Sequence, residues 1–427
     1  MKVGILTLGC RVNQYESDAI SEALEKRGCE IGDFDSDCDL YIINTCTVTA
    51  ESDSKSRKAV RRALRTAEKN GGKVAVIGCF VQGAREEYDE LKNAHYISGN
   101  RDKSEIVNCL ERLMSGERLD LRETLTGAEY ENMSIDSRRY VKAYVKIEDG
   151  CNNFCSYCYV PFVRGRVRSR NQEDIINEIK RLTARGYKEV ILTGIETSSY
   201  GEDFDTNEPL VTLVERIGRE APVSRLRFGS LHPSFFTEES LKRLKAVEGV
   251  MPHFHLSVQS ASNKVLSDMR RPYGKAELYK AVENIRHFFP DANLSCDMIC
   301  GFPWEREEDF QDSIDFIKKA EILHTHVFPY SKREGTKAAE MKEVPNAVKY
   351  ERARIMQKTA DEVHKLVFEK NIGKEYNMLL EFFKDGRALG YTENFINLSV
   401  PIPEGSEKGD VIKVKISRDM DKKFTNS

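Results

Sequence analysis

Three cysteines lie within eight residues of the sequence, in the stretch CNNFCSYC. They are Cys151, Cys155 and Cys158, spaced CxxxCxxC, and the next cysteine along the chain is Cys296. A closed zinc site requires four ligands, and no histidine stands between Cys158 and His232 to complete one. Three thiolates can hold three irons of a [4Fe–4S] cluster and leave the fourth iron open to a non-protein ligand. The spacing therefore favours an open iron–sulfur cluster over the alternative, a structural zinc or disulfide knot.

A second set of three cysteines is dispersed in the sequence but equivalent in position. Cys10, Cys46 and Cys79 each end or follow an apolar run, in GILTLGC, YIINTC and VAVIGC. The carboxyl ends of parallel strands line one crevice of an α/β sheet, so these thiols can converge on one site. The alternative is that cysteines are simply common in apolar strands. Periodicity alone leaves both interpretations open.

The elements that must position the second set alternate along the first 115 residues. The runs KVGILTL, DLYIINT, KVAVIG and AHYISG are typical of strands, and the stretches between them have helical spacing. One long charged helix is expected over residues 50–70 and another near 102–115. Strands that alternate with helices predict a parallel α/β sheet for residues 1–115. Residues 116–140 are polar without a sustained apolar period, which indicates a linker.

From residue 141 the alternation begins again around the first set of cysteines. Six strand candidates follow, VKAYVKI, EVILT, RLRFGS, FHLSV, NLSCDMI and THVFPY, with helices expected near 171–185, 209–220, 237–247, 275–288 and 307–319. A capping box of Ser169 and Gln172 marks the start of the first helix. This pattern predicts an open or partial (β/α)6 barrel over 141–370, ending in a helix near 345–371. In such barrels the chemistry sits at the carboxyl ends of the strands.

The last segment, residues 371–427, contains short β-like runs broken by Gly, Pro and Asn, which predicts a small all-β barrel. The whole chain of 427 residues has a net charge of −3, so any basic surface must be local. No segment approaches the roughly 20 apolar residues of a membrane helix, and we expect no membrane association. The start of the chain lacks the pattern of a signal peptide, and the cysteine count is odd, so a reduced, cytoplasmic protein is expected.

The motif CxxxCxxC after the first strand of a (β/α) barrel resembles that of the radical S-adenosylmethionine (SAM) enzymes. In that family the open iron is chelated by the methionine part of SAM, and the reduced cluster cleaves SAM to a 5′-deoxyadenosyl radical. An aromatic residue usually precedes the last cysteine and contacts the adenine. Tyr157 occupies that position here.

The contexts of the other three cysteines, GCRVNQYES, NTCTVTAESDSKSR and GCFVQ, resemble the N-terminal domain of the methylthiotransferases. In that family these thiolates hold a second [4Fe–4S] cluster, whose open iron carries the sulfur that is methylated and inserted. The resemblance covers nearly the whole chain. It implies a Rossmann- or flavodoxin-like N-terminal domain, a radical SAM partial barrel and a C-terminal TRAM domain, an OB-like β-barrel that binds RNA.

Further motifs of the family, including TGIETSSYG, SLHPSFFTEE and SVQSASNKVLSDMRRPY, imply which residues contact SAM. These are Gly194, Glu196, Ser230, His232, Gln259 and Ser260. The sequence departs from the family pattern at Ala261, Cys300 and Trp304, where Gly, Val and Gly are usual. Cys296 and Cys300 share one side of a strand, and a role in the core is expected for both.

The resemblance is strongest to the group that modifies C2 of N6-threonylcarbamoyladenosine beside the anticodon of tRNA, with one SAM as methyl donor and one as radical source. Alternatives within the family are isopentenyl-adenosine in tRNA and an aspartate of a ribosomal protein. A non-catalytic iron–sulfur RNA-binding or sensor protein is the alternative from another class. The implied partners are the tRNA anticodon stem-loop and an electron donor such as flavodoxin or ferredoxin, and the protein is expected to be a monomer.

Basic residues suited to RNA occur in three places. Arg164, Arg166, Arg168 and Arg170 alternate in RGRVRSR, so in an extended segment all four project from one face and are expected to grip phosphate or a carboxylate. The helix after Cys46 carries a basic face, and the last domain places lysines among aromatic residues. The RNA contacts expected there are Arg61, Arg62, Lys413 and Lys415. The alternative for each group is a solvated charged surface.

Overall fold

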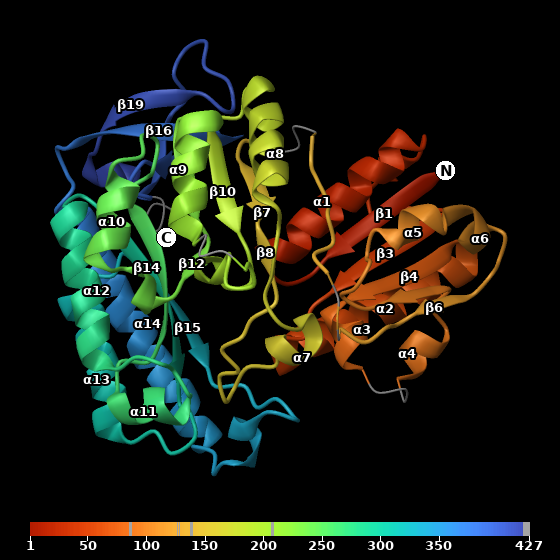
Figure 1. The fold of residues 1–427 in the computed structure, drawn as a ribbon, viewed down its shortest axis with the longest axis horizontal. Coiled ribbons are helices and arrows are strands. Elements are labelled where there is room, and N and C mark those ends of the chain that lie inside the picture. Colours follow the sequence, from red (N-terminus) through yellow and green to blue (C-terminus); the bar gives the residue numbers. More distant parts are fainter. Residues whose placement is uncertain (85–87, 126, 128, 137–139, 206–208, 422–427) are drawn as a thin grey trace.

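The computed structural model describes the chain except residues 85–87, 126, 128, 137–139, 206–208 and 422–427. Three bodies lie together in it: an N-terminal sheet, a curved central array of strands and helices, and a C-terminal sheet (Figure 1). Within the described residues, no helix has the length and apolar character that crossing a membrane requires.

The N-terminal body is a six-stranded sheet in the order β2-β1-β3-β4-β5-β6, parallel throughout. Its strands are β1 (Lys2–Thr7), β2 (Glu30–Gly32), β3 (Leu40–Thr45), β4 (Lys73–Gly78), β5 (Tyr96–Ser98) and β6 (Leu119–Leu121). The central strand β3 is buried along its whole length, as expected where helices cover both faces of a parallel sheet. The predicted parallel α/β fold is confirmed.

The helices of this body are α1 (Arg11–Lys26), α2 (Ala50–Asn70), α3 (Cys79–Gly83), α4 (Asp89–Lys92), α5 (Glu105–Asn108) and α6 (Leu110–Met114). The long helix expected over 50–70 is α2, whereas the helix expected near 102–115 is broken into α5 and α6. The sheet also reaches beyond the expected boundary at residue 115, because β6 pairs with β5. A three-residue edge strand is too short to show a periodic pattern, which explains its assignment to the linker.

The central body contains the six predicted strands, all parallel to their neighbours. They are β7 (Ala143–Lys146), β10 (Glu189–Thr193), β11 (Arg225–Phe228) with its continuation β12 (Ser230–Leu231), β13 (His253–Gln259), β14 (Asn293–Cys300) and β15 (His324–Pro329). The order is β11-β10-β7 in one sheet and β12-β13-β14-β15 in the next, and a bridge from Leu226 to Val250 joins the two. The array is therefore an open, partial (β/α) barrel.

Helices cover the outer side of this barrel (Figure 1). They are α8 (Gln172–Ala184), α9 (Leu210–Glu220), α10 (Glu238–Lys245), α11 (Asn263–Asp268), α12 (Lys275–Phe288) and α13 (Glu307–Lys319), followed by α14 (Asn346–Glu369). Alternate strand residues such as Phe254, Leu256 and Cys296 belong to the core beneath the helices. The residues between them, such as Ser257, project from the opposite face, which is the interior of the barrel.

The C-terminal body is a four-stranded antiparallel sheet in the order β18-β17-β16-β19, which confirms the predicted small all-β domain. Its strands are β16 (Glu375–Lys384), β17 (Arg387–Thr392), β18 (Asn397–Pro401) and β19 (Val411–Lys415). It seals the end of the barrel at which the strands begin. Arg225 and Arg227 at the start of β11 donate hydrogen bonds to main-chain oxygens of this domain, and the ring of His253 stacks on Phe395 at 3.9 Å.

Candidate active site

The first cysteine triad lies where β7 ends. The short strand β8 (Glu148–Asp149) pairs with β9 (Arg168–Ser169), and the loop between them carries all three cysteines and helix α7 (Val160–Arg164). Cys151 and Cys155 are buried and Cys158 is half-buried. Desolvation, with the neighbouring thiols adding to it, raises the pKa of Cys151 and of Cys158 to about 12. Such thiols are weak nucleophiles, and a bound metal is what would deprotonate them.

Arg271 supports this triad from the strand array. Its guanidinium donates to the Cys155 sulfur at 3.3 Å and to the Ser257 carbonyl at 2.6 Å. The contact fixes the position of the Cys155 sulfur relative to the barrel strands. Arg271 did not figure among the predicted site residues, although it stands in the quoted motif MRRPY.

Three buried polar atoms without a partner lie at the carboxyl ends of the barrel strands. Among the described residues, Glu148 Oε2, Thr197 Oγ1 and His232 Nε2 have no hydrogen-bond partner although all three are buried. Unsatisfied buried groups are costly, so the presence of these three atoms at one rim fits a polar ligand such as SAM. The rim adjoins the first triad, because the charge of Glu196 contributes to the pKa of Cys151.

The predicted SAM contacts Gly194 and Glu196 lie on this rim. A Cβ on Gly194 would stand 1.9 Å from Glu148 Oε1, so only glycine permits this approach. The Glu196 amide donates to the same oxygen at 2.7 Å, and its carboxylate accepts from Ser198 at 2.7 Å. Desolvation raises the pKa of Glu196 and of Glu148. Glu148 is a further rim residue that was not predicted. It could have been found in the sequence as a carboxylate at the end of a buried strand.

His232 is buried and its ring packs edge-on against Tyr273 at 4.7 Å. Burial, reinforced by the charge of Arg271, lowers the pKa of His232 to about 3, so the imidazole is neutral at physiological pH. Its Nδ1 bonds Ser234 at 2.7 Å while Nε2 stays available. This arrangement suits a neutral hydrogen-bonding contact to a ligand.

The other predicted SAM contacts occupy neighbouring strand ends. Ser230 begins β12, Gln259 ends β13 with a left-handed φ of 67°, and Ser260 is buried beside it. Tyr157 packs edge-on to Phe302 at 6.4 Å. The structure therefore gathers the predicted residues at one end of the barrel, while their contact with SAM stays a prediction.

The positions that depart from the family pattern have different surroundings. Ala261 and Cys300 are fully buried, and Trp304 is exposed with a φ of 60°. Cys296 is also fully buried, which agrees with the expected core role of the two strand cysteines.

The second triad comes together at the carboxyl edge of the N-terminal sheet, where β1, β3 and β4 are neighbours. Cys10 caps α1, Cys46 follows β3 and Cys79 begins α3. Desolvation raises the pKa of Cys10 and of Cys46, with Cys79 adding to both shifts and Cys10 adding to that of Cys46. Asn100 donates to the Cys79 sulfur at 3.3 Å. The structure thus brings together three cysteines that are far apart in the sequence.

A buried ion network joins the two triads' domains. Arg164 donates to Glu16 Oε1 at 2.8 Å and to both Asp149 oxygens at 3.0 Å, and Lys146 binds the same two carboxylates at 2.7 Å. The charge of Arg164 also acts on Cys10 and Cys79. Burial opposes ionisation of Glu16, but Arg164, Lys103 and Lys146 outweigh it and hold the pKa of Glu16 well below its usual range.

The predicted row of four RNA-facing arginines is wrong for three of its members. Arg164 is only 1% exposed, Arg168 donates to the Arg164 carbonyl at 2.7 Å, and Arg170 is buried against Glu178. The segment is not extended throughout, because α7 ends at Arg164, and carboxylates of both domains meet it. Arg166 alone is exposed, with its guanidinium 4.5 Å from the Phe154 ring.

The remaining predicted RNA contacts are on the surface. Arg61 and Arg62 on α2 are half-exposed and pair with Glu90 and Asp35. Lys413 on β19 pairs with Glu375 at 2.7 Å, and Lys415 is exposed. The pairs of Arg62 and Lys413 are exposed on both sides and therefore weak, whereas Arg61 is held by the buried carboxylate of Glu90, and the RNA-binding role of all four residues stays a prediction.

The second triad is also tied to the loop after β15. Arg333 donates to Asp53 at 2.6 Å and to Thr47 at 2.7 Å, and Ser331 accepts from the Ala50 amide at 3.2 Å. These contacts border a cavity of about 440 Å³ between the N-terminal sheet and the barrel. The loops that carry the two triads therefore face a shared interdomain region.

Known protein families match both the N-terminal sheet and the central barrel. The profile of the Radical SAM superfamily matches residues 145–317, and that of the uncharacterized protein family UPF0004 matches residues 2–99. The chain is 37% identical to the threonylcarbamoyladenosine tRNA methylthiotransferase MtaB of Aquifex aeolicus, over 97% of this chain and 100% of that protein. The chain belongs to the radical SAM methylthiotransferase family.

Other methylthiotransferases are similar. MtaB of Bacillus subtilis is 34% identical over 97% of this chain and 93% of its own length. The tRNA-2-methylthio-N(6)-dimethylallyladenosine synthase of Natranaerobius thermophilus is 36% identical over 79% of this chain and 76% of its own length. Among solved structures, the radical SAM methyltransferase TsrM of Kitasatospora setae has a TM-score of 0.59 at 17% identity, covering 79% of this chain and 77% of that one. That likeness concerns the fold alone.

This methylthiotransferase is accordingly a radical SAM enzyme that uses a [4Fe–4S] cluster and SAM. Cys151, Cys155 and Cys158 carry the motif of that cluster, and the unpartnered polar rim beside them fits the cofactor.

Proposed function

We propose that this methylthiotransferase acts on tRNA and modifies C2 of N6-threonylcarbamoyladenosine beside the anticodon, giving the 2-methylthio derivative. The observation that carries the proposal is similarity along the full chain to proteins named threonylcarbamoyladenosine tRNA methylthiotransferase, with 100% of the Aquifex aeolicus protein covered. The presence of both cysteine triads in one interdomain region supports the same reaction.

The two triads have different tasks in this proposal. Cys151, Cys155 and Cys158 hold the cluster at which one SAM is cleaved, and Cys10, Cys46 and Cys79 hold a second [4Fe–4S] cluster. When bound, these groups supply the radical and the methylated sulfur. The chain itself orients them: Arg271 binds Cys155, Asn100 binds Cys79, and Arg164 fixes the domains that carry the triads. The target nucleotide has to leave the stack of the anticodon loop to reach this region.

Dimethylallyladenosine in tRNA is the second candidate substrate, because one enzyme named for it is 36% identical to this chain. Mass spectrometry of tRNA nucleosides from a strain without this protein distinguishes the two. We expect loss of 2-methylthio-N6-threonylcarbamoyladenosine with the dimethylallyl derivative retained. An unchanged level of the threonylcarbamoyl product would refute the substrate assignment.

Substitution in each triad tests the division of tasks. Cys151→Ala should abolish 5′-deoxyadenosine formation, whereas Cys46→Ala should retain uncoupled SAM cleavage and lose methylthiolation. Iron analysis after anaerobic reconstitution should give about eight irons per chain for wild type and about four for each variant. Loss of SAM cleavage in both variants would contradict two separate sites. Absence of deoxyadenosine from the wild type would favour a non-catalytic iron–sulfur protein.

An electron donor such as flavodoxin or ferredoxin, a monomeric state and a cytoplasmic location belong to the same proposal. Reduction of the reconstituted protein by each donor, followed by deoxyadenosine formation, tests the first of these.

A further inference from the structure

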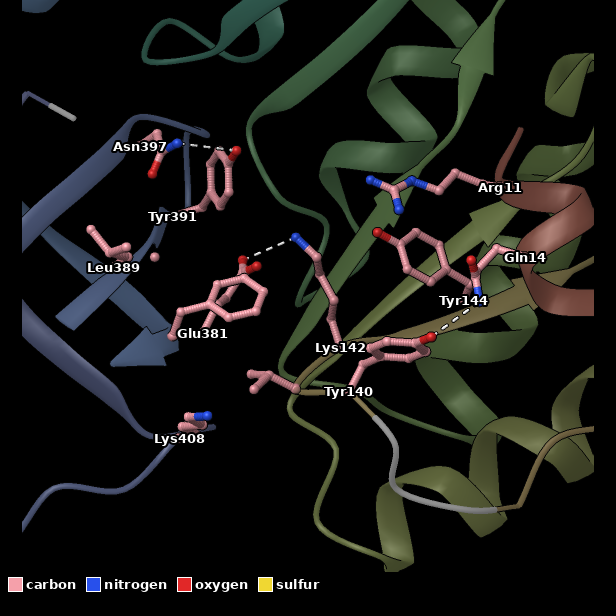
Figure 2. A pocket seen from close by; sticks show the side chains of 13 residues that line it. Arg11, Gln14, Tyr140, Lys142, Tyr144, Glu381, Leu389, Tyr391, Asn397 and Lys408 are labelled. Carbon is pink, nitrogen blue, oxygen red and sulfur yellow. Dashed lines mark hydrogen bonds and ion pairs between the residues drawn. The ribbon is translucent and has the colours of Figure 1, made fainter. Parts of the chain in front are cut away.

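A cavity of about 540 Å³ lies where the three bodies of the molecule meet. Figure 2 shows side chains from α1, from β7 and the residues before it, and from the C-terminal sheet converging on it. The volume is within the range of small-molecule sites, which are about 300–1,000 Å³. None of the six triad cysteines lines this cavity, but one of its walls, α1, begins directly after Cys10.

The position of Arg11 connects the cavity with the second triad. Arg11 directly follows Cys10, and its exposed side chain extends from the start of α1 into the cavity (Figure 2). Tyr144 lies opposite, two residues before Lys146 of the ion network. The Arg11 guanidinium stands over the Tyr144 ring, 4.9 Å from its centre. A group bound to Arg11 is therefore held next to the region that the triads face.

The walls of the cavity are aromatic, and their charges are not balanced. Tyr140, Tyr144, Phe382 and Tyr391 contribute rings. Lys142 is neutralised by Glu381 at 2.9 Å and lies 4.9 Å from the Tyr391 ring. No carboxylate of the described residues is within 4.0 Å of the Arg11 guanidinium. Lys408, an exposed lysine at the rim, adds a second positive charge, so among the described residues Arg11 and Lys408 give the cavity an excess of positive charge that suits an anionic ligand.

We propose that Arg11 binds the carboxylate of the N6-threonylcarbamoyl substituent, in the cavity between α1, β7 and the C-terminal sheet. This inference rests on the proposed function. That substituent ends in a carboxylate, which guanidinium binds in bidentate fashion with planar geometry. The aromatic walls lower the local dielectric and strengthen the pair. A dimethylallyl substituent is uncharged and gains nothing from Arg11.

The test compares three anticodon stem-loop RNAs with the reconstituted protein. One carries threonylcarbamoyladenosine, the second carries its methyl ester, and the third carries unmodified adenosine. Wild type should bind the acid about tenfold to a hundredfold more tightly than the ester, in proportion to the worth of a charge-assisted hydrogen bond. Arg11→Gln should bind acid and ester equally, with affinity for unmodified RNA unchanged. Arg11→Lys keeps the positive charge but lacks the planar pair of N–H donors, so it should retain part of the preference for the acid over the ester.

Arg219→Gln is the control, because Arg219 is an exposed arginine on the outer helix α9 and should alter none of the three affinities. Iron content and circular dichroism of each variant verify that it folds and carries its clusters. Equal weakening of all three RNAs by Arg11→Gln would identify a phosphate contact and overturn the proposal. If Arg11→Gln still bound the acid more tightly than the ester, the role of Arg11 would also be refuted. The proposed function would nevertheless stand if the protein formed product on the threonylcarbamoyl RNA. A fourth stem-loop, which carries dimethylallyladenosine, separates the two proposals further: if the wild type modified that RNA alone, both would be refuted.

Discussion

At the scale of single residues, the most informative feature is the use of buried charge to join domains. Arg164, Lys103 and Lys146 surround Glu16 and Asp149, and all of them are almost completely buried. Taking charges out of water is costly unless each finds its partner, so the network is satisfied only in one relative placement of the two domains. It acts as a positional lock more than as a source of net stability.

Glu16→Gln should weaken the attachment between the N-terminal sheet and the barrel. The substitution leaves three buried cations with one carboxylate, and losing one partner of a buried pair costs about 3 kcal/mol. We expect a lower urea midpoint and faster amide exchange in α1 and α7. Glu51→Gln is the matched control, because Glu51 pairs with Lys55 in the same domain but is exposed, and its midpoint should equal that of wild type. Identical midpoints for both variants would argue against the lock.

At the scale of elements, both triads depend on where strands end. The turn between β1 and α1 shows how tightly one end is built. Gly9 has a φ of 97°, and a Cβ there would lie 2.6 Å from the Cys46 Cβ and 2.7 Å from its sulfur.

The capping box predicted for the start of α8 is wrong, because Asn171 caps the helix by accepting a hydrogen bond from the Glu173 amide. The predicted cap, Ser169, instead belongs to β9.

Gly9→Ala should displace Cys10 and Cys46 and disrupt the second triad. After reconstitution we expect iron to fall from about eight to about four per chain, with SAM cleavage at the first cluster retained. Gly28→Ala is the control. Gly28 also has a positive φ, 81°, but no atom lies within 4 Å of its added Cβ, so the backbone strain is similar and the crowding is absent. Full iron content in Gly9→Ala would show that the turn tolerates the side chain.

At the scale of the whole molecule, the C-terminal sheet closes one end of the barrel and also contributes to the cavity that Arg11 enters. Arg225 and Arg227 each bind Glu189 through Nε, at 2.8 and 2.9 Å, and use their remaining nitrogens for carbonyls of the C-terminal sheet. These contacts fix the position of the C-terminal sheet relative to the barrel.

Arg227→Met should loosen that attachment. The change removes hydrogen bonds to the carbonyls of Thr392 and Glu393, and we expect amide exchange to accelerate in β16, β17 and β18. Iron content should not change, because neither cysteine triad contacts this interface. Arg219→Met provides the exposed control. Unaltered exchange in the three strands would show that stacking and apolar packing hold the domain without Arg227.

The same interface should weaken in acid. Burial, followed by the charge of Arg227, lowers the pKa of His253 well below its usual value of 6.5, so the native ring stays neutral where the unfolded one is protonated. The unfolded chain then binds more protons below pH 6.5, and the free energy of unfolding decreases as pH falls, by at most about 1.4 kcal/mol per pH unit for one histidine. His253→Gln should reduce this slope between pH 6.5 and 5 in urea titrations. An equal slope in the variant would exclude His253 as the source.

The sequence by itself determined the first triad, the parallel strands of both sheets and the order of the three bodies, whereas spacing alone left the convergence of Cys10, Cys46 and Cys79 open. Those features are local, because CxxxCxxC is a spacing and a strand is an apolar run, whereas the meeting of three dispersed cysteines depends on how the strands are ordered in the sheet. Only the tertiary structure decided which charges face water. Arg164 binds Glu16, which is 148 residues away in the sequence. The pattern RGRVRSR contains no information that a carboxylate of another domain buries this arginine. Burial depends on partners that are remote in sequence, and for that reason the arginines expected on the surface became the joint between the domains.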